Sequence, residues 1–312
     1  MVERHPSSIR YCVCHHNLLM IGPPGAGKTL LARLMPTILP PLSFEEALET
    51  TAIHSVAGLV PSEKGVITLR PFRAPHHSVS DAGLVGGGSI PRPGDVSLAH
   101  NGVLFLDELA EFRRSALEAL RQPLEDGQVT IARAKGTLTF PARPMVIAAL
   151  NPCPCGYFMH PARHCRCTAF QIQRYRLRLS GPLLDRLDVH VALLPVDIKS
   201  LTSSNDAESS AVVRARVAQT RGAQVDRYRQ GVVGVRSNAE LGPTDLDKVA
   251  GLDGKGRQLI ESATEALGLS AREYTRIRRV ARTIADLEGK DAIQSAHVAE
   301  AIQGRLLDRE RY

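Results

Sequence analysis

The segment with the clearest chemistry is a glycine-rich turn that ends in a lysine and a threonine: Gly22, Pro23, Pro24, Gly25, Ala26, Gly27, Lys28 and Thr29. Its glycines let consecutive backbone amides approach phosphate oxygens, and the N-terminus of a following helix adds positive potential. Lys28 would neutralise charge on the β- and γ-phosphates, and the Thr29 hydroxyl would ligate Mg²⁺. This G-x-x-x-x-G-K-[ST] pattern predicts a P-loop that binds ATP with Mg²⁺.

Two acids and an asparagine follow other apolar segments. Asp107 and Glu108 come directly after the apolar run at 103–106, and Asn151 follows the apolar run at 145–150. Ligands of parallel α/β sheets bind at the carboxyl ends of the strands, where these side chains would lie. Asp107 would hold the Mg²⁺ shell, and Glu108 would polarise a water for attack on the γ-phosphate. Asn151 could reach the γ-phosphate or that water, although an Asn-Pro pair after a strand is often only a turn.

A second group with chemical potential consists of four cysteines in two C-x-C pairs: Cys153, Cys155, Cys165 and Cys167. Four thiolates are a complete tetrahedral set for a structural Zn²⁺. The spacing departs from the usual C-x₂₋₄-C pattern, and His160 or His164 could replace a cysteine as ligand. The alternatives are four reduced thiols in a loop, or a redox pair.

The elements around these residues indicate an α/β fold. Apolar runs at 17–21, 103–106, 145–150 and 189–194 predict strands, and segments at 28–38 and 43–50 predict helices, the second opened by a capping box of Ser43 and Glu46. Leu117, Leu120 and Leu124 form the stripe of a further helix. Fully apolar strands that alternate with helices are typical of a parallel sheet between helix layers.

The rest of the chain divides around this core. Residues 1–16 are interpreted as a tail, 17–199 as the α/β core and 200–312 as a helical domain whose clearest helix spans 271–287. The tail carries a third C-x-C pair, Cys12 and Cys14, beside two histidines, which is a weaker candidate for a metal site. Within the core, residues 129–131 and 136–140 predict a hairpin across a turn that contains Arg133 and Lys135.

Composition limits the possible classes of function. Of the 312 residues, 43% are hydrophobic and 23% charged, which excludes a disordered or fibrous chain as a whole. The net charge of +7 favours a polyanionic partner, while the 4% aromatic content argues against an extensive base-stacking surface. The sequence contains no run of about 18 apolar residues that could span a membrane, so we expect a cytoplasmic protein without a membrane partner.

Longer segments of the chain resemble a known family. The P-loop, the acids of LFLDE and the later asparagine resemble an AAA+ ATPase. More specific resemblance lies in RPFRAPHHS (70–78), GGGSIPRPGDVSLAHNGVLFLDEL (86–109), RQPLEDG (121–127), LNPCPCG (150–156), LSGPLLDRLD (179–188) and LSAREYTRIRRVARTIADLEG (269–289). These segments are similar to the magnesium-chelatase-like AAA+ group, in its competence-protein (ComM/YifB) branch. The similarity extends from about residue 17 to the C-terminus.

The resemblance implies further roles. Asn151 corresponds to the sensor-1 residue, and Arg186 to an arginine finger that acts in trans on a neighbouring subunit's ATP. Arg272 corresponds to the sensor-2 arginine, with Arg276 as the alternative. The implied assembly is a ring, usually a hexamer, and the hairpin at Arg133 would contact the DNA backbone in helicase-like relatives.

The resulting functional hypothesis is an AAA+ ATPase motor that acts on DNA in branch migration or as a helicase, during transformation or recombination. One alternative is the motor subunit of a chelatase that inserts a metal into a porphyrin. Another is a shortened chain that binds nucleotide without hydrolysing it. Members of the branch carry an N-terminal domain resembling the Lon protease domain, and a helical segment that helps to hold the adenine, and we expect both to be missing here.

Overall fold

The computed structural model describes residues 14–60, 65–88, 90–133, 136–195 and 208–305. By their contacts, these residues form two compact units. One contains the described residues among 20–186 and 193–195, and the other contains residues 14–19, 187–192 and 208–305. The boundary that we expect between residues 199 and 200 lies outside the described residues. No described helix combines the length and the apolar character that a membrane span requires.

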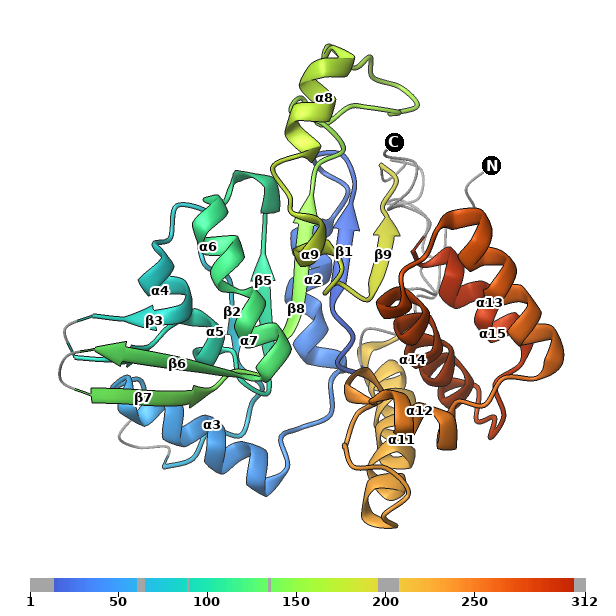
Figure 1. The fold of residues 1–312 in the computed structure, drawn as a ribbon. Coiled ribbons are helices and arrows are strands. Elements are labelled where there is room, and N and C mark those ends of the chain that lie inside the picture. The colour runs from blue at the N-terminus through green and yellow to red at the C-terminus, as the bar shows by residue number, and fades with distance from the viewer. Residues whose placement is uncertain (1–13, 61–64, 89, 134–135, 196–207, 306–312) are drawn as a thin grey trace. The chain divides into compact units, whose positions relative to one another are not determined.

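A five-stranded parallel sheet forms the centre of the fold, with strand order β2-β5-β8-β1-β9 (Figure 1). Its strands are β1 (Leu18–Ile21), β2 (Phe72–Arg73), β5 (Val103–Leu106), β8 (Met145–Leu150) and β9 (Val189–Ala192). Every residue of β5 and β8 is buried, as expected for central strands that helices cover on both faces. The parallel α/β core predicted from the sequence is therefore confirmed.

Helices of the α/β unit connect and cover these strands: α2 (Lys28–Ile38), α3 (Phe44–Val56), α4 (Asp81–Val85), α5 (Asp95–Leu98), α6 (Arg114–Ala119), α7 (Arg121–Asp126), α8 (Ala169–Arg176) and α9 (Gly181–Leu184). A 3-10 turn, η2 (Leu109–Glu111), follows β5. The predicted capping box at the start of α3 is present. The Ser43 hydroxyl accepts a hydrogen bond from the Glu46 amide, and the Glu46 carboxylate accepts one from the Ser43 amide.

The prediction of a single helix around Leu117, Leu120 and Leu124 is wrong. The structure divides the segment into α6 and α7, which are interrupted at Leu120. Pro123 explains the interruption: it has no amide to donate to the carbonyl of residue 119, and its ring crowds that carbonyl.

Two small antiparallel pairs stand apart from the central sheet. β3 (Gly86–Gly87) pairs with β4 (Arg92–Pro93), and β6 (Gln128–Arg133) pairs with β7 (Gly136–Pro141). The second pair confirms the predicted hairpin, with Arg133 opposite Gly136 at its tip. Lys135, the other basic residue of that turn, lies outside the described residues.

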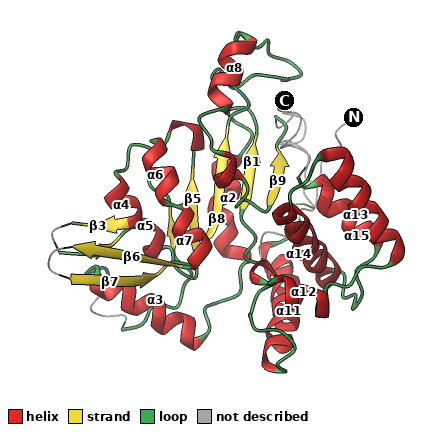
Figure 2. Cartoon of the chain, viewed as in Figure 1, coloured by secondary structure: helices red, strands yellow, loops and turns green. Residues whose placement is uncertain are grey.

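The other unit is mostly helical (Figure 2). Its elements after residue 208 are α11 (Ser210–Arg229), η3 (Asn238–Glu240), α12 (Pro243–Val249), α13 (Gly254–Leu267), α14 (Ala271–Leu287) and α15 (Ser295–Gln303). Helix α14 has the bounds predicted from the sequence and buries Ile277, Val280 and Ile284 of its apolar stripe. It packs against α15, α11 and η3.

Candidate functional site

The P-loop occupies the turn between β1 and α2. Gly25 and Gly27 have φ of +80° and +81°, the left-handed region that glycine adopts most easily. Gly27 is the N-cap of α2 and provides no side chain to cap it, so the first amides of the helix stay available to a ligand. A Cβ on Gly22 would lie 2.7 Å from the carbonyl oxygen of Leu193. The backbone thus requires glycine at these positions and has the form of an anion cradle.

Lys28 links this loop to the candidate sensor residue. Its Nζ donates to the carbonyl oxygens of Gly22 and Pro23 at 2.7 and 3.0 Å, and to Oδ1 of Asn151 at 3.0 Å. Burial lowers the pKa of Lys28, while the carboxylates of Asp107 and Glu108 raise it. Through its hydrogen bond to Asn151, the Lys28 amine contacts the side chain at the end of β8 that we expect to face the γ-phosphate.

The two acids follow β5 in different environments. Thr29 Oγ1 donates to Oδ2 of Asp107 at 2.7 Å, so the hydroxyl and the carboxylate that are expected to hold Mg²⁺ lie together. Oxygen donors of this kind suit Mg²⁺, and the donor set fits the ion. Glu108 has a φ of +53°, an uncommon value for a residue with a side chain, which turns the chain sharply after the strand. Its side chain is about half exposed (53%) and can meet a water.

The RPFRAPHHS segment contains a contact for which the sequence suggested no role. His77 Nδ1 lies 3.4 Å from Oε2 of Glu108, and the His77 ring packs edge-on against Phe112. The start of the segment is anchored by the buried Arg70, which donates to Glu46 at 2.9 Å and to the carbonyl of Asn101 at 2.6 Å. His77 is therefore a neighbour of the candidate general base that sequence reasoning missed. Only its place in a family-specific motif could have pointed to it.

All four cysteines of the predicted metal site lie together, directly after Asn151. Their sulfur atoms are within 4.8 Å of one another. Neither histidine named as a substitute belongs to this group. His160 accepts bonds from the amides of Ala162 and Arg163 through Nδ1 at 3.0 and 2.9 Å, which explains its position.

Arg186, the expected arginine finger, is engaged inside its own chain. Its side chain is 8% exposed, and it donates to Glu125 Oε2 at 2.5 Å and to the carbonyl of Pro182 at 2.6 Å. A finger that reaches another subunit must first release Glu125.

The two candidate sensor-2 arginines, Arg272 and Arg276, lie on α14 of the helical unit. Arg272 is exposed in the first turn of the helix, whereas Arg276 Nε lies 3.4 Å from Oδ1 of Asp188. Asp188 also accepts the amide of Asn17 at 2.9 Å and lies 3.6 Å from Nδ1 of His16. Burial alone would raise the pKa of Asp188, but His16 and Arg276 lower it to about 2. Arg272 is therefore the more accessible of the two candidates.

The end of the segment interpreted as a tail packs into the helical unit. Cys14 is buried, and burial raises the pKa of its thiol to about 12. His15 Nε2 contacts Arg221 at 2.7 Å, and His16 Nε2 bonds Thr283 Oγ1 at 2.8 Å. Among the described residues of this segment the side chains thus have partners in the helical unit. Cys12 lies outside the described residues.

Comparison with known proteins adds to this geometry. Residues 10–201 match the family described as magnesium chelatase, subunit ChlI, and residues 207–305 match its C-terminal domain. The chain belongs to the magnesium chelatase ChlI family. The AAA+ core with a C-terminal helical domain, expected from the resemblance, is confirmed by this match together with the parallel sheet.

Relatives place this family member near the competence-protein branch. It is 47% identical over 296 residues to the uncharacterized protein YifB of Salmonella typhimurium, and 47% identical over 299 residues to the competence protein ComM of Haemophilus influenzae. Each match covers 94% of this chain and 56% of the relative, so the chain spans little more than half the length of either. A weaker similarity, 22% over 298 residues, connects 94% of this chain to 32% of the zygotic DNA replication licensing factor mcm6-A of Xenopus laevis.

Proposed function

We propose that the chain is an ATP-hydrolysing motor of the AAA+ type that acts on DNA. The observation that carries the ATPase proposal is the grouping of four side chains at one edge of the sheet. Lys28 contacts Asn151 at 3.0 Å, and Thr29 of the same helix turn contacts Asp107 at 2.7 Å. The helix N-terminus, the cation and the oxygen ligands that a nucleoside triphosphate with Mg²⁺ needs are thus next to one another.

Each residue has a distinct part in the proposed reaction. Mg²⁺ with the nucleotide supplies charge neutralisation on the phosphate oxygens. Lys28 exchanges the loop carbonyls for phosphate oxygens and adds a positive charge, while Asp107 and Thr29 hold the ion. Glu108 accepts the proton of the attacking water, because its carboxylate is exposed beside the ion-binding residues. Asn151 orients the water or the γ-phosphate.

The relation to neighbouring subunits completes the proposed site. Arg186 of one chain is proposed to leave Glu125 and stabilise the charge that develops on the γ-phosphoryl group of the neighbouring chain. Arg272 is proposed to contact the nucleotide from the lid. An arginine that acts in trans can serve every site only if each chain contacts the next, as in a ring. We propose a ring of six subunits.

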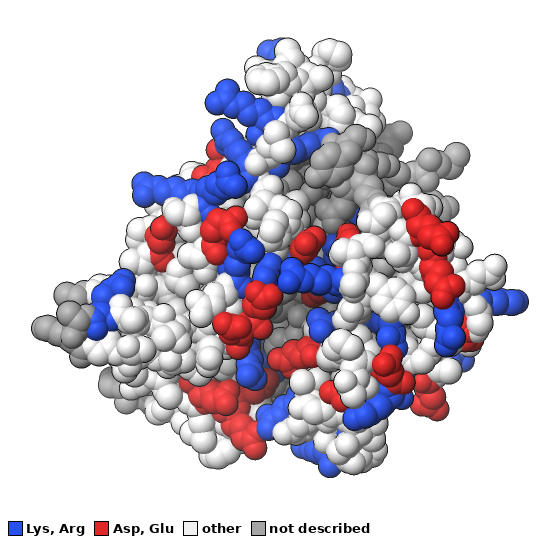
Figure 3. All heavy atoms as spheres, in the orientation of Figure 1, with Lys and Arg blue, Asp and Glu red and all other residues white. Residues whose placement is uncertain are grey.

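Besides the similarity to ComM and mcm6-A, two basic regions support DNA as the proposed substrate: the segment around α8 and the tip of the β6–β7 hairpin. The segment from Asn151 to Leu184 contains five arginines and no acidic residue. Figure 3 shows Lys and Arg side chains gathered around the base of the α8 protrusion. Exposed arginines there and at the tip of the β6–β7 hairpin could track a phosphate backbone.

The test is ATP hydrolysis with and without DNA. We expect DNA to stimulate hydrolysis, and Glu108→Gln to reduce the rate about a hundredfold or more while nucleotide still binds. Glu265→Gln, the same substitution at an exposed position of α13, is the matched control. Hydrolysis that Glu108→Gln leaves unchanged would refute the assigned role of the acid.

The DNA proposal has its own variants. Arg174→Gln in α8 and Arg133→Gln in the hairpin should weaken both DNA binding and its stimulation of hydrolysis, with a smaller salt dependence of binding. Arg257→Gln, exposed on α13, should change neither. Hydrolysis that responds to a chelatase partner but not to DNA would favour the second candidate, the chelatase motor, for which the match to subunit ChlI is the supporting observation.

A further inference from the structure

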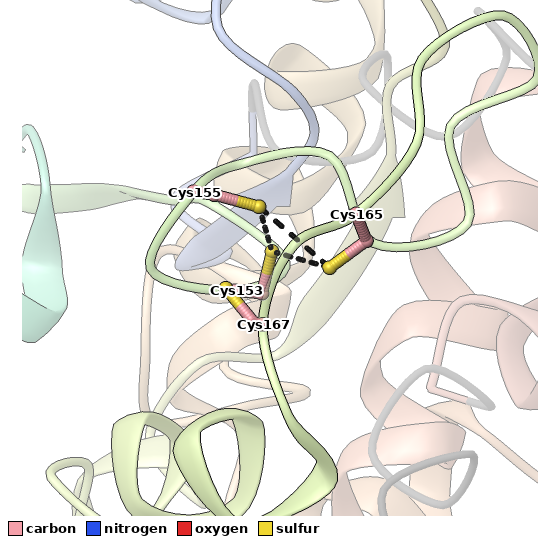
Figure 4. Close-up of side chains that lie close together, drawn as sticks. All are labelled: Cys153, Cys155, Cys165 and Cys167. Atoms are coloured by element: carbon pink, nitrogen blue, oxygen red, sulfur yellow. Dashed lines mark hydrogen bonds between the residues drawn. The ribbon is translucent and has the colours of Figure 1, made fainter.

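Four cysteine sulfurs form a compact group beside the candidate nucleotide site (Figure 4). The Sγ atom of Cys153 lies 3.4 Å from that of Cys155 and 3.7 Å from that of Cys165, and the last two are 3.6 Å apart. The Sγ atom of Cys167 completes the group, in which all four sulfurs lie within 4.8 Å of one another. Both pairs belong to the loop between β8 and α8, one shortly after β8 and the other shortly before α8, and this loop brings the two pairs together.

We propose that this group is a structural Zn²⁺ site with four thiolate ligands. At a Zn–S distance of about 2.3 Å, the sulfurs of a regular tetrahedron are about 3.8 Å apart. The three separations given above are close to that length, and no disulfide joins any of these cysteines. Four protein ligands leave no open position for a substrate or water, so the ion stabilises structure and takes no part in hydrolysis.

The short distances between the sulfurs favour a single metal ion over an iron–sulfur cluster. An iron–sulfur cluster places several irons and inorganic sulfides between its cysteine ligands, which moves the ligand pairs apart. Here all four sulfurs lie within 4.8 Å of one another, which fits a single ion. Zn²⁺ is the common ion for four thiolates in a tetrahedral arrangement.

The surroundings suit the charge of such a site. Zn²⁺ with four thiolates carries two net negative charges. The amide of Phe158 donates to Cys153 Sγ at 3.3 Å, a contact that supports a thiolate. The nearest chain segment contributes arginines without any acid, including Arg163 and Arg166 on either side of Cys165. The two net negative charges of the site would therefore lie in a chain segment that carries arginines and no acid.

The position of the site indicates what the ion would hold in place. Cys153 is buried two residues after Asn151, and the same turn continues to Gly156. Gly156 has a φ of +82°, and a Cβ there would lie 2.5 Å from Cδ of Pro24 in the P-loop. The ion would thus hold a turn that bears the candidate sensor residue at one end and touches the P-loop at the other. This role, unlike the metal site itself, rests on the proposed function.

The decisive experiment measures metal in the purified full chain. We expect about one Zn²⁺ per chain by mass spectrometry of the metals, released when an organomercurial titrates the thiols. Cys165→Ser should lose most of the zinc, whereas Cys14→Ala, a buried cysteine outside the group, and His160→Ala should retain it. Removal of zinc with a strong chelator should lower the temperature of unfolding of the wild-type chain, and added Zn²⁺ should restore it.

A second measurement covers the case in which the serine variant fails to fold. Co²⁺ added to the metal-free wild-type chain should produce the intense visible absorption of a tetrahedral cobalt tetrathiolate, which added Zn²⁺ then abolishes. A reduced chain that contains no zinc and does not bind added Zn²⁺ or Co²⁺ would overturn the proposal, as would iron in the isolated chain or zinc retained by a folded Cys165→Ser variant. Because no measurement depends on hydrolysis, a chain that binds zinc but does not hydrolyse ATP would refute the proposed function alone.

Discussion

Replacement of Asp188 by asparagine is the sharpest test of how α14, the helix that bears the two candidate sensor-2 arginines, is anchored. The carboxylate is buried, accepts the Asn17 amide at 2.9 Å, and faces His16 and Arg276 at 3.6 and 3.4 Å, all within the helical unit. Asparagine keeps nearly the same shape and one carbonyl acceptor but removes the charge. The substitution therefore isolates the electrostatic part of the contact.

The pKa of Asp188 sets the expected magnitude. Burial would raise the pKa, but His16 and Arg276 lower it from 3.8 to about 2 in the folded chain. A difference of nearly two pKa units between the unfolded and the folded chain corresponds to about 2.5 kcal/mol of stability at neutral pH. Arg276 also loses its ion pair with the buried carboxylate, so removal of the charge is expected to cost about 3–5 kcal/mol.

The sign of the pH dependence follows from a lowered carboxyl pKa. The stabilisation is fully present above the unfolded pKa of about 4 and is lost as the pH falls through the folded pKa of about 2. At pH 3 about half of the electrostatic contribution remains. The difference in unfolding free energy between wild type and Asp188→Asn should thus shrink as the pH falls from 7 to 3.

Urea unfolding, followed by far-ultraviolet circular dichroism, measures this difference in the full chain. Asp247→Asn is the matched control, because Asp247 is 72% exposed and its ion pair with Arg278 is expected to contribute less than about 1 kcal/mol. A loss below about 1 kcal/mol for Asp188→Asn at pH 7, or the same loss at pH 7 and pH 3, would contradict the reasoning.

Four further predictions concern the candidate nucleotide site. Lys28→Ala should weaken ATP binding by about ten- to a hundredfold, the loss of a hydrogen bond to a charged group, as measured by calorimetric titration. Arg186→Ala and Lys28→Ala chains should each be inactive in hydrolysis but regain part of the activity when mixed, since one interface can then combine both intact residues; no recovery would argue against action in trans. Gly156→Ala should displace the P-loop and weaken ATP binding, whereas Gly251→Ala, where a Cβ meets open space, should not. His77→Ala should lower kcat more than it raises KM, and a change in KM alone would exclude a role beside the general base.

Much of the fold follows from local sequence patterns. The bounds of α2, β8 and α14 agree with those predicted, because each element carries its own periodicity and clear end signals. The interruption between α6 and α7 was also encoded locally, at Pro123, but the leucine stripe concealed it. The P-loop and the acids after β5 could be found because strand, turn and helix adjoin in the chain.

Contacts between distant segments could not be obtained in this way. The bond between Lys28 and Asn151 and the pair of His77 with Glu108 depend on the order of strands in the sheet. The buried Arg282 is a second example: its side chain is 2% exposed, and its guanidinium donates to the carbonyl oxygen of Val249 at 3.2 Å, 33 residues earlier in the chain.

By itself, the sequence determined the family, the α/β core and the types of residue that can bind ATP and Mg²⁺, because these depend on patterns that are continuous along the chain. Tertiary structure decided which side chains meet. It turned Arg186 toward Glu125 and placed Asp188 next to His16 and Arg276, and it brought the sulfurs of the four cysteines that the sequence had suggested as ligands within 4.8 Å of one another. The physical reason is that a buried charge needs partners, and the fold supplies them from parts of the chain that local patterns cannot connect.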